Sequence, residues 1–92
     1  MRQLWKLSNV KAETERDYRI ALQQEILIQR TNGVQATLIP DLARGATANL
    51  KFERDKAEAL YNTTKDSLRA LQASLNAYQT MVRFQEDLEK RG

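Results

Sequence analysis

The sequence predicts an all-α fold, either a long helical hairpin or a coiled coil. One proline and three glycines in 92 residues are too few for a turn-rich β fold. Good helix formers, chiefly Ala, Leu, Gln, Glu, Lys and Arg, dominate the chain. Apolar side chains also recur every seven residues in its second half, as in helices that wind around one another. At this length, residues 1–92 should form a single helical domain.

The first element is a helix over residues 8–31, with an earlier start left open. Tyr18, Leu22 and Ile26 follow one another at intervals of four and so share one face. Ala21 and Ile28 should widen this face. We expect Leu27 to belong to the intrachain core, so that a charge there would damage the fold.

Helix-supporting signals surround the end of this element. Glu15 and Arg19 form an acid-before-base pair one turn apart. Asn32-Gly33 is a strong stop signal, because glycine adopts the left-handed conformation of a helix C-cap at little cost.

Residues 33–47 are predicted to be an irregular connector. Pro40 restricts Ile39 to extended geometry, although it could also open a helical turn from Asp41. A short helix in this stretch is therefore the alternative. Leu38 and Leu42 would either fold back onto the helices or contact a partner.

A long helix is predicted over residues 47–90, which contain no glycine or proline. At 1.5 Å per residue it would be roughly 66 Å long. Thr63 and Asp66 fit a capping box, so the alternative is a three-helix bundle with a break near Thr63. Passage of the heptad pattern through this point favours the continuous helix.

The heptad pattern defines an apolar stripe on the long helix. We predict that this stripe is an interaction seam between chains, since the first helix is too short to cover all of it. Four further residues, Leu60, Met81, Phe84 and Leu88, widen the stripe and favour contact with more than one helix. The predicted seam consists of Ala57, Tyr61, Leu68, Leu71, Leu75, Tyr78 and Val82.

A basic segment occupies residues 1–12. It contains three cations and no acid, and the rest of the chain is balanced, so the net charge of +3 arises here. Such an end can touch a lipid surface or an acidic partner. The plain alternative is that these charges only aid solubility. The predicted contact residues are Arg2, Leu4, Trp5 and Lys6.

Two absences argue against catalysis. Without cysteine the chain has no thiolate nucleophile, disulfide or zinc finger, and without histidine it lacks the commonest general base and metal ligand. There is also no glycine-rich phosphate loop. Lys51, Arg54 and Lys56 lie beside Phe52, but two acidic residues interrupt this cluster. We therefore expect no enzyme activity, cofactor, metal or small-molecule substrate, and no sustained nucleic-acid surface.

The sequence contains neither a secretory signal pattern nor an apolar run long enough to cross a membrane. We expect a protein of the cytoplasm, or one that lies inside a protein assembly.

Residues 68–92 resemble the long Leu/Ala/Gln-rich helices of outer-membrane efflux tunnels and their periplasmic adaptors. Within them, "LNAYQTMVRFQ" (75–85) is similar to the helical tail of a small flagellar rod-base protein. Each resemblance covers less than a third of the chain, and neither extends to the first helix or to the connector. They do not assign a family.

Two functions are compatible with these features. The first is a non-enzymatic structural or adaptor subunit, which packs its long amphipathic helix into a multi-chain assembly by self-association or with partner helices. The second is a small dimeric regulatory or nucleic-acid-associated protein that uses its basic N-terminus. Salt separates them, because phosphate binding weakens steeply as salt rises whereas apolar helix packing does not.

Overall fold

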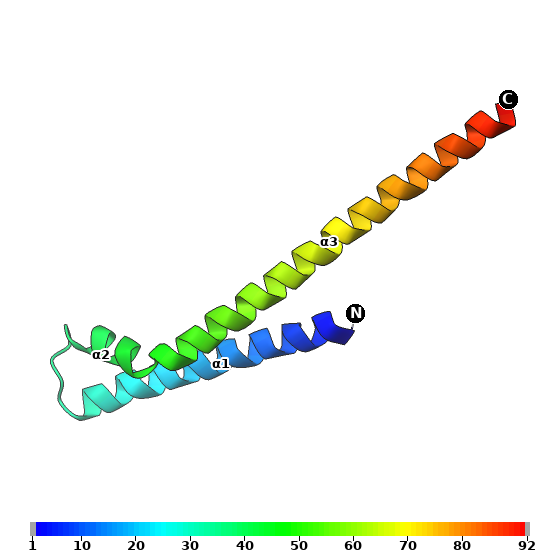
Figure 1. Cartoon of the computed structure of the whole chain (residues 1–92). Helices are drawn as coiled ribbons and strands as arrows, with labels where there is room; N and C mark the ends of the chain where they lie inside the picture. Colours follow the sequence, from blue (N-terminus) through cyan, green and yellow to red (C-terminus); the bar gives the residue numbers. More distant parts are fainter. Residues whose placement is uncertain (1, 92) are drawn as a thin grey trace. The chain divides into compact units, whose positions relative to one another are not determined.

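The computed structural model describes residues 2–91 and confirms the all-α prediction: these residues form three helices and no strand. The helices are α1 (Arg2–Thr31), α2 (Ile39–Ala46) and α3 (Ala48–Arg91) (Figure 1). The chain divides into two compact units, Met1–Tyr61 and Asn62–Gly92. The first unit holds α1, α2 and the first turns of α3, and the second holds the rest of α3.

α1 begins six residues before the predicted position 8 and ends where predicted, at Thr31. Its early start follows from residues 2–7, which are helix formers without glycine or proline. The stop is a Schellman motif at Gly33, which has a φ of 75°. The Gly33 N–H donates to the Arg30 carbonyl over 3.0 Å, and the Val34 N–H donates to the Gln29 carbonyl over 3.1 Å.

α2 lies inside the predicted connector, so the short-helix alternative is the one that the structure contains. Pro40 occupies the first turn of α2, where its missing N–H has no intrahelical partner to lose. α2 contacts α1 and buries Ile39 and Ala43, whereas Leu42 and the preceding Leu38 are exposed. Only residues 32–38 are non-helical between α1 and α2.

Thr47 alone separates α2 from α3. Its N–H and its hydroxyl both donate to the Ala43 carbonyl, over 3.1 and 2.8 Å. Its own carbonyl accepts the first hydrogen bond of α3, from the Lys51 N–H at 3.0 Å. Because these polar groups are paired, Thr47 can be buried at the junction.

The buried residues of the first unit form a small core. One face of α1 carries Tyr18, which is buried, and Leu22 and Ile26, which are half-buried, as predicted. The prediction for Leu27 is wrong: 63% of this residue is exposed. Successive helical residues turn by about 100°, so Leu27 points away from the face that Ile26 occupies. The buried core residues are Tyr18, Ile39, Ala43, Thr47 and Ala57.

α3 passes through Thr63 without a break, which confirms the predicted long helix over residues 47–90 within one residue at each end. A capping-box pattern inside a helix is compatible with continuity where no glycine or proline interrupts the hydrogen bonds.

Candidate interaction surface

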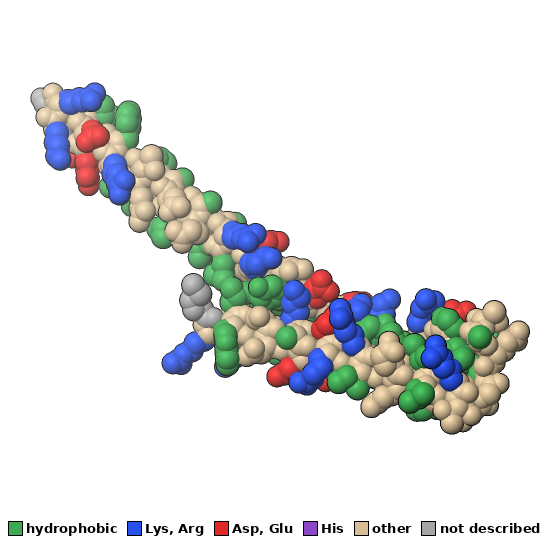
Figure 2. Space-filling view, turned by 180° about the vertical axis from the view of Figure 1, so that it is seen from behind, with side chains coloured by type: hydrophobic (Ala, Val, Ile, Leu, Met, Phe, Trp, Pro, Cys, Tyr) green, Lys and Arg blue, Asp and Glu red, His purple; other side chains and the backbone are tan. Residues whose placement is uncertain are grey.

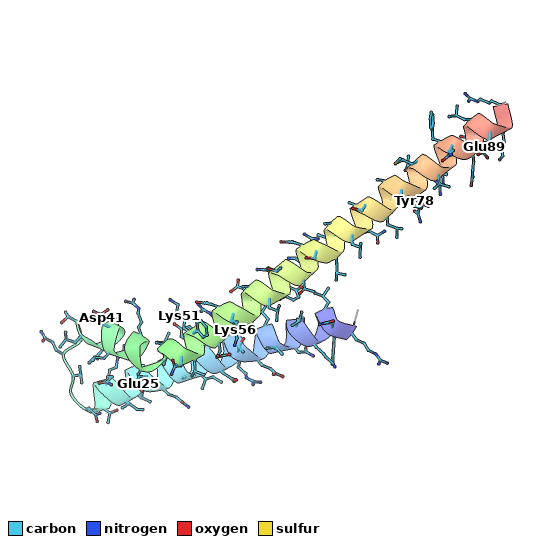
Figure 3. The ribbon with its side chains drawn as sticks, in the orientation of Figure 1. Glu25, Asp41, Lys51, Lys56, Tyr78 and Glu89 are labelled. Atoms are coloured by element: carbon cyan, nitrogen blue, oxygen red, sulfur yellow. The ribbon has the colours of Figure 1, made fainter. Side chains whose placement is uncertain are left out.

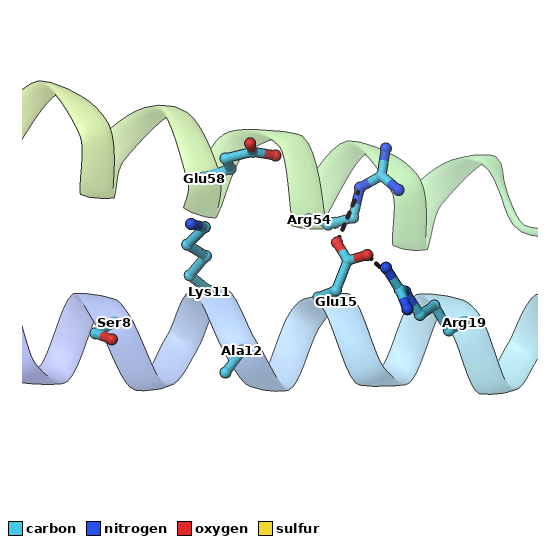
Figure 4. Close-up of a pocket in the computed structure, with 7 residues that line it drawn as sticks. All are labelled: Ser8, Lys11, Ala12, Glu15, Arg19, Arg54 and Glu58. Atoms are coloured by element: carbon cyan, nitrogen blue, oxygen red, sulfur yellow. Dashed lines mark hydrogen bonds and ion pairs between the residues drawn. The ribbon is translucent and has the colours of Figure 1, made fainter.

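A cluster of charged side chains joins α1 to the first turns of α3 (Figure 4). Glu15 lies at its centre, where one carboxylate oxygen accepts a hydrogen bond from Arg19 over 2.7 Å. The other oxygen lies 3.6 Å from Nε of Arg54, on the facing helix. The Arg54 guanidinium also lies 4.5 Å from the centre of the Tyr18 ring. The predicted Glu15–Arg19 pair is therefore present, and Arg54 extends it between helices.

The neighbours of Arg54 favour its charged form. A side-chain hydrogen bond to Asp55 raises the pKa of Arg54 above its ordinary value, with Glu15 contributing. A second cation–aromatic pair lies one heptad further along each helix, where Nζ of Lys11 is 4.8 Å from the Tyr61 ring centre. Each helix thus contributes one tyrosine and one cation: Tyr18 and Lys11 on α1 contact Arg54 and Tyr61 on α3.

These side chains border a shallow hollow of about 600 Å³. Its charged groups face one another across the two helices, so we interpret it as part of the helix contact and not as a catalytic site. Its lining consists of Ser8, Lys11, Ala12, Glu15, Arg19, Arg54 and Glu58.

The structure places the predicted seam in two different environments. Ala57 is 8% exposed and Tyr61 is half-buried, and both belong to the packing of the first unit. The remaining members lie in the second unit, and we call them the first seam. These are Leu68, Leu71, Leu75, Tyr78 and Val82.

Residues 62–91 include no buried side chain. Most of their large apolar residues are exposed, by 42% at Leu68 to 69% at Met81, and Val82 is half-buried. Residues 70–82 also carry no charged side chain, so nothing in this stretch offsets the exposed apolar surface with strong hydration. Figure 2 shows apolar side chains, in green, at the surface along this part of α3. Tyr78 and Glu89 project outward from the helix (Figure 3).

A second seam, which the predicted stripe does not separate from the first, runs beside it. Its members also follow heptad spacing, but the first three are small and the last three are large. Sequence alone predicts only that Met81, Phe84 and Leu88 widen the stripe, since alanine and serine do not stand out as apolar signals. The second seam consists of Ala70, Ser74, Ala77, Met81, Phe84 and Leu88.

The predicted N-terminal contact residues do not share one environment. Trp5 is 67% exposed, and Arg2 and Lys6 are exposed on either side of it in sequence. Leu4 is half-buried, so it does not form one continuous exposed ridge with Trp5. Contact through this end stays a prediction.

Two of the basic residues near Phe52, Arg54 and Lys56, are paired with acids. Lys56 forms an ion pair with Glu53 at 3.3 Å, and Arg54 forms one with Asp55 at 2.9 Å. Residues 2–91 contain no group of three or more His, Cys, Asp or Glu side chains placed to hold a metal ion. None of their helices is long and apolar enough to span a membrane.

Comparison of the chain with protein-family models, curated proteins and solved structures finds no match.

Proposed function

We propose that this chain is a non-enzymatic structural or adaptor subunit that packs residues 62–91 of α3 against helices of a multi-chain assembly. The observation that carries the proposal is the second unit itself, a helical segment with two apolar seams and no buried side chain. In proteins, tertiary packing of an apolar face supplies most of the stability of a helix. We therefore expect neighbouring helices to stabilise this segment.

The first unit supports an anchoring role for the rest of the chain. Its core, its capped turn at Gly33 and its cross-helix ion pair hold α1, α2 and the start of α3 together.

The absence of cysteine is compatible with a reducing compartment, and we propose that the protein lies in the cytoplasm or within a protein assembly.

Leu71→Glu tests the proposal. Burying one leucine contributes roughly 1.5–3 kcal/mol, and a charge in the seam adds a desolvation cost. We expect Leu71→Glu to lower the molar mass measured by light scattering, while the circular dichroism of the first unit persists. Asn76→Glu, which puts the same charge on the polar face of α3, away from both apolar seams, should keep the wild-type mass.

Salt provides the second arm of the test. Association through the apolar seams should persist at high salt, whereas an assembly held by the basic N-terminus should dissociate. The proposal fails if the wild-type chain is monomeric with residues 62–91 helical and protected from hydrogen exchange. It also fails if Leu71→Glu unfolds such a monomer.

A further inference from the structure

The two seams of residues 62–91 lie on different sides of the helix. With about 3.6 residues per turn, their mean directions differ by about 120°. A single neighbouring helix can cover one seam and leaves the other in water. Two exposed seams therefore require two neighbours for each copy of the segment.

The two seams have complementary side-chain sizes: where one seam carries large side chains, the other carries small ones, and the roles change once along the helix. Between residues 68 and 78 the first seam presents large side chains, of which Leu71 and Leu75 are examples. At the same levels along the helix axis, the second seam presents the small side chains of Ala70, Ser74 and Ala77. Further along, the order reverses.

Towards the C-terminus the second seam becomes the larger one. It presents Met81 and Phe84, where the first seam has the smaller Val82. From residue 68 to residue 82, the first seam of one helix and the second seam of a parallel, in-register copy therefore fit large against small. Facing layers of alternating size pack to high density.

From this complementarity we infer that the occupant of each seam is a second copy of this chain. The copies lie parallel and in register, with the first seam of one against the second seam of the next. Such a contact joins two different surfaces, so it continues from copy to copy and forms a ring or a filament. The inference rests on the proposed function and names its partner.

Other arrangements of the same segment fit less well. If two first seams met in parallel, Glu89, which continues the first seam, would face its own copy and repel it. An antiparallel pairing of the first seam with the second would set Leu68 near Phe84 at one end. At the other end Val82 would lie near Ala70, so the helices could not keep one separation.

Complementary charges across the seams test the arrangement. Leu71→Glu alters only the first seam, and Ala70→Lys alters only the second seam at the same height. Each variant alone should need an at least roughly tenfold higher concentration for half-association than the wild type. An equimolar mixture should recover most of the wild-type mass, because every contact in an alternating ring is then either Glu against Lys or unaltered.

Two controls make the result specific. A mixture of Leu71→Glu with Ala70→Glu should not recover, because like charges then meet. The double variant carrying Leu71→Glu and Ala70→Lys in one chain should associate by itself. Circular dichroism of each variant checks that the first unit is still folded.

Three results overturn the inference. The first is that Ala70→Lys alone associates like the wild type. The second is that the mixture of Leu71→Glu and Ala70→Lys does not recover the wild-type mass. The third is that the wild-type chain is monomeric at every accessible concentration. If Leu71→Glu lowers the mass but mixing does not restore it, only the inference fails. If residues 62–91 are helical and protected from exchange in a monomer, the proposed function fails as well.

Discussion

Arg54 is the residue that links the two long helices of the first unit most directly. It contacts the Glu15 carboxylate and the Tyr18 ring on α1, and only 22% of its side chain is exposed. A guanidinium can stack on an aromatic ring and pair with a carboxylate at once, which an ammonium cannot do as well. Arg54 therefore sets which turn of α3 faces which turn of α1.

Replacing Arg54 should weaken the first unit. Arg54→Met removes the ion pair and the ring contact together, so we expect a lower urea midpoint by circular dichroism. Arg54→Lys should fall between this variant and the wild type. Arg16→Met is the matched control, because Arg16 pairs only with its exposed neighbour Asp17 on the same helix. Equal midpoints for Arg16→Met and Arg54→Met would show that the cross-helix contact contributes nothing.

At the level of single residues, the sequence could predict Glu15–Arg19 because both lie on one helix at a fixed spacing. It could not predict Arg54 as their partner, since the register between two helices is not encoded in local spacing. For the same reason the heptad stripe did not reveal that the chain itself packs around Ala57 while Leu71 stays exposed. A periodic pattern defines a face but not what covers it.

Among the elements, α1 and α3 follow directly from the absence of breakers, and the glycine at position 33 marks the turn between them. α2 was less predictable. Pro40 both restricts the residue before it and favours a first helical turn, and Gly45 lowers the helix propensity of the same eight-residue segment. Burial of Ile39 and Ala43 against α1 decides in favour of the helix.

Replacing glycine by alanine should have opposite effects on the free energy of unfolding at Gly33 and at Gly45. An added Cβ meets no atom within 4 Å at either Gly33 or Gly45, so space is not the issue at either site. Gly33 has a φ of 75°, and Gly33→Ala should destabilise the chain by about 1 kcal/mol. Gly45 is helical, and Gly45→Ala should stabilise it by about 0.5–1 kcal/mol. Urea unfolding checks both, and a change of the same sign in both variants would contradict the assignment of Gly33 as the cap.

On the scale of the whole molecule, stability is distributed unevenly along the chain. The first unit contains every buried residue of the part that the structure describes, and residues 62–91 contain none. Helical structure in the second unit should therefore depend on association.

Hydrogen exchange measured at two concentrations tests this dependence. In dilute protein, amides of residues 62–91 should exchange much faster than those of α1 near Tyr18, because an unpartnered helix opens often. At concentrations where the mass rises, the same amides should become protected, and α1 should change little. Protection of residues 62–91 that is independent of concentration would rule out association as its source.

The division at Tyr61 also has a kinetic consequence. The first unit forms from contacts within one chain, so its folding rate should not depend on how much protein is present. Helical ordering of residues 62–91 requires an encounter between molecules, so its rate should rise with concentration. Refolding after dilution from denaturant would then separate into a fast first-order phase and a slower phase of higher order. A nascent chain could fold its first unit alone, and residues 62–91 would become ordered only when other copies are present.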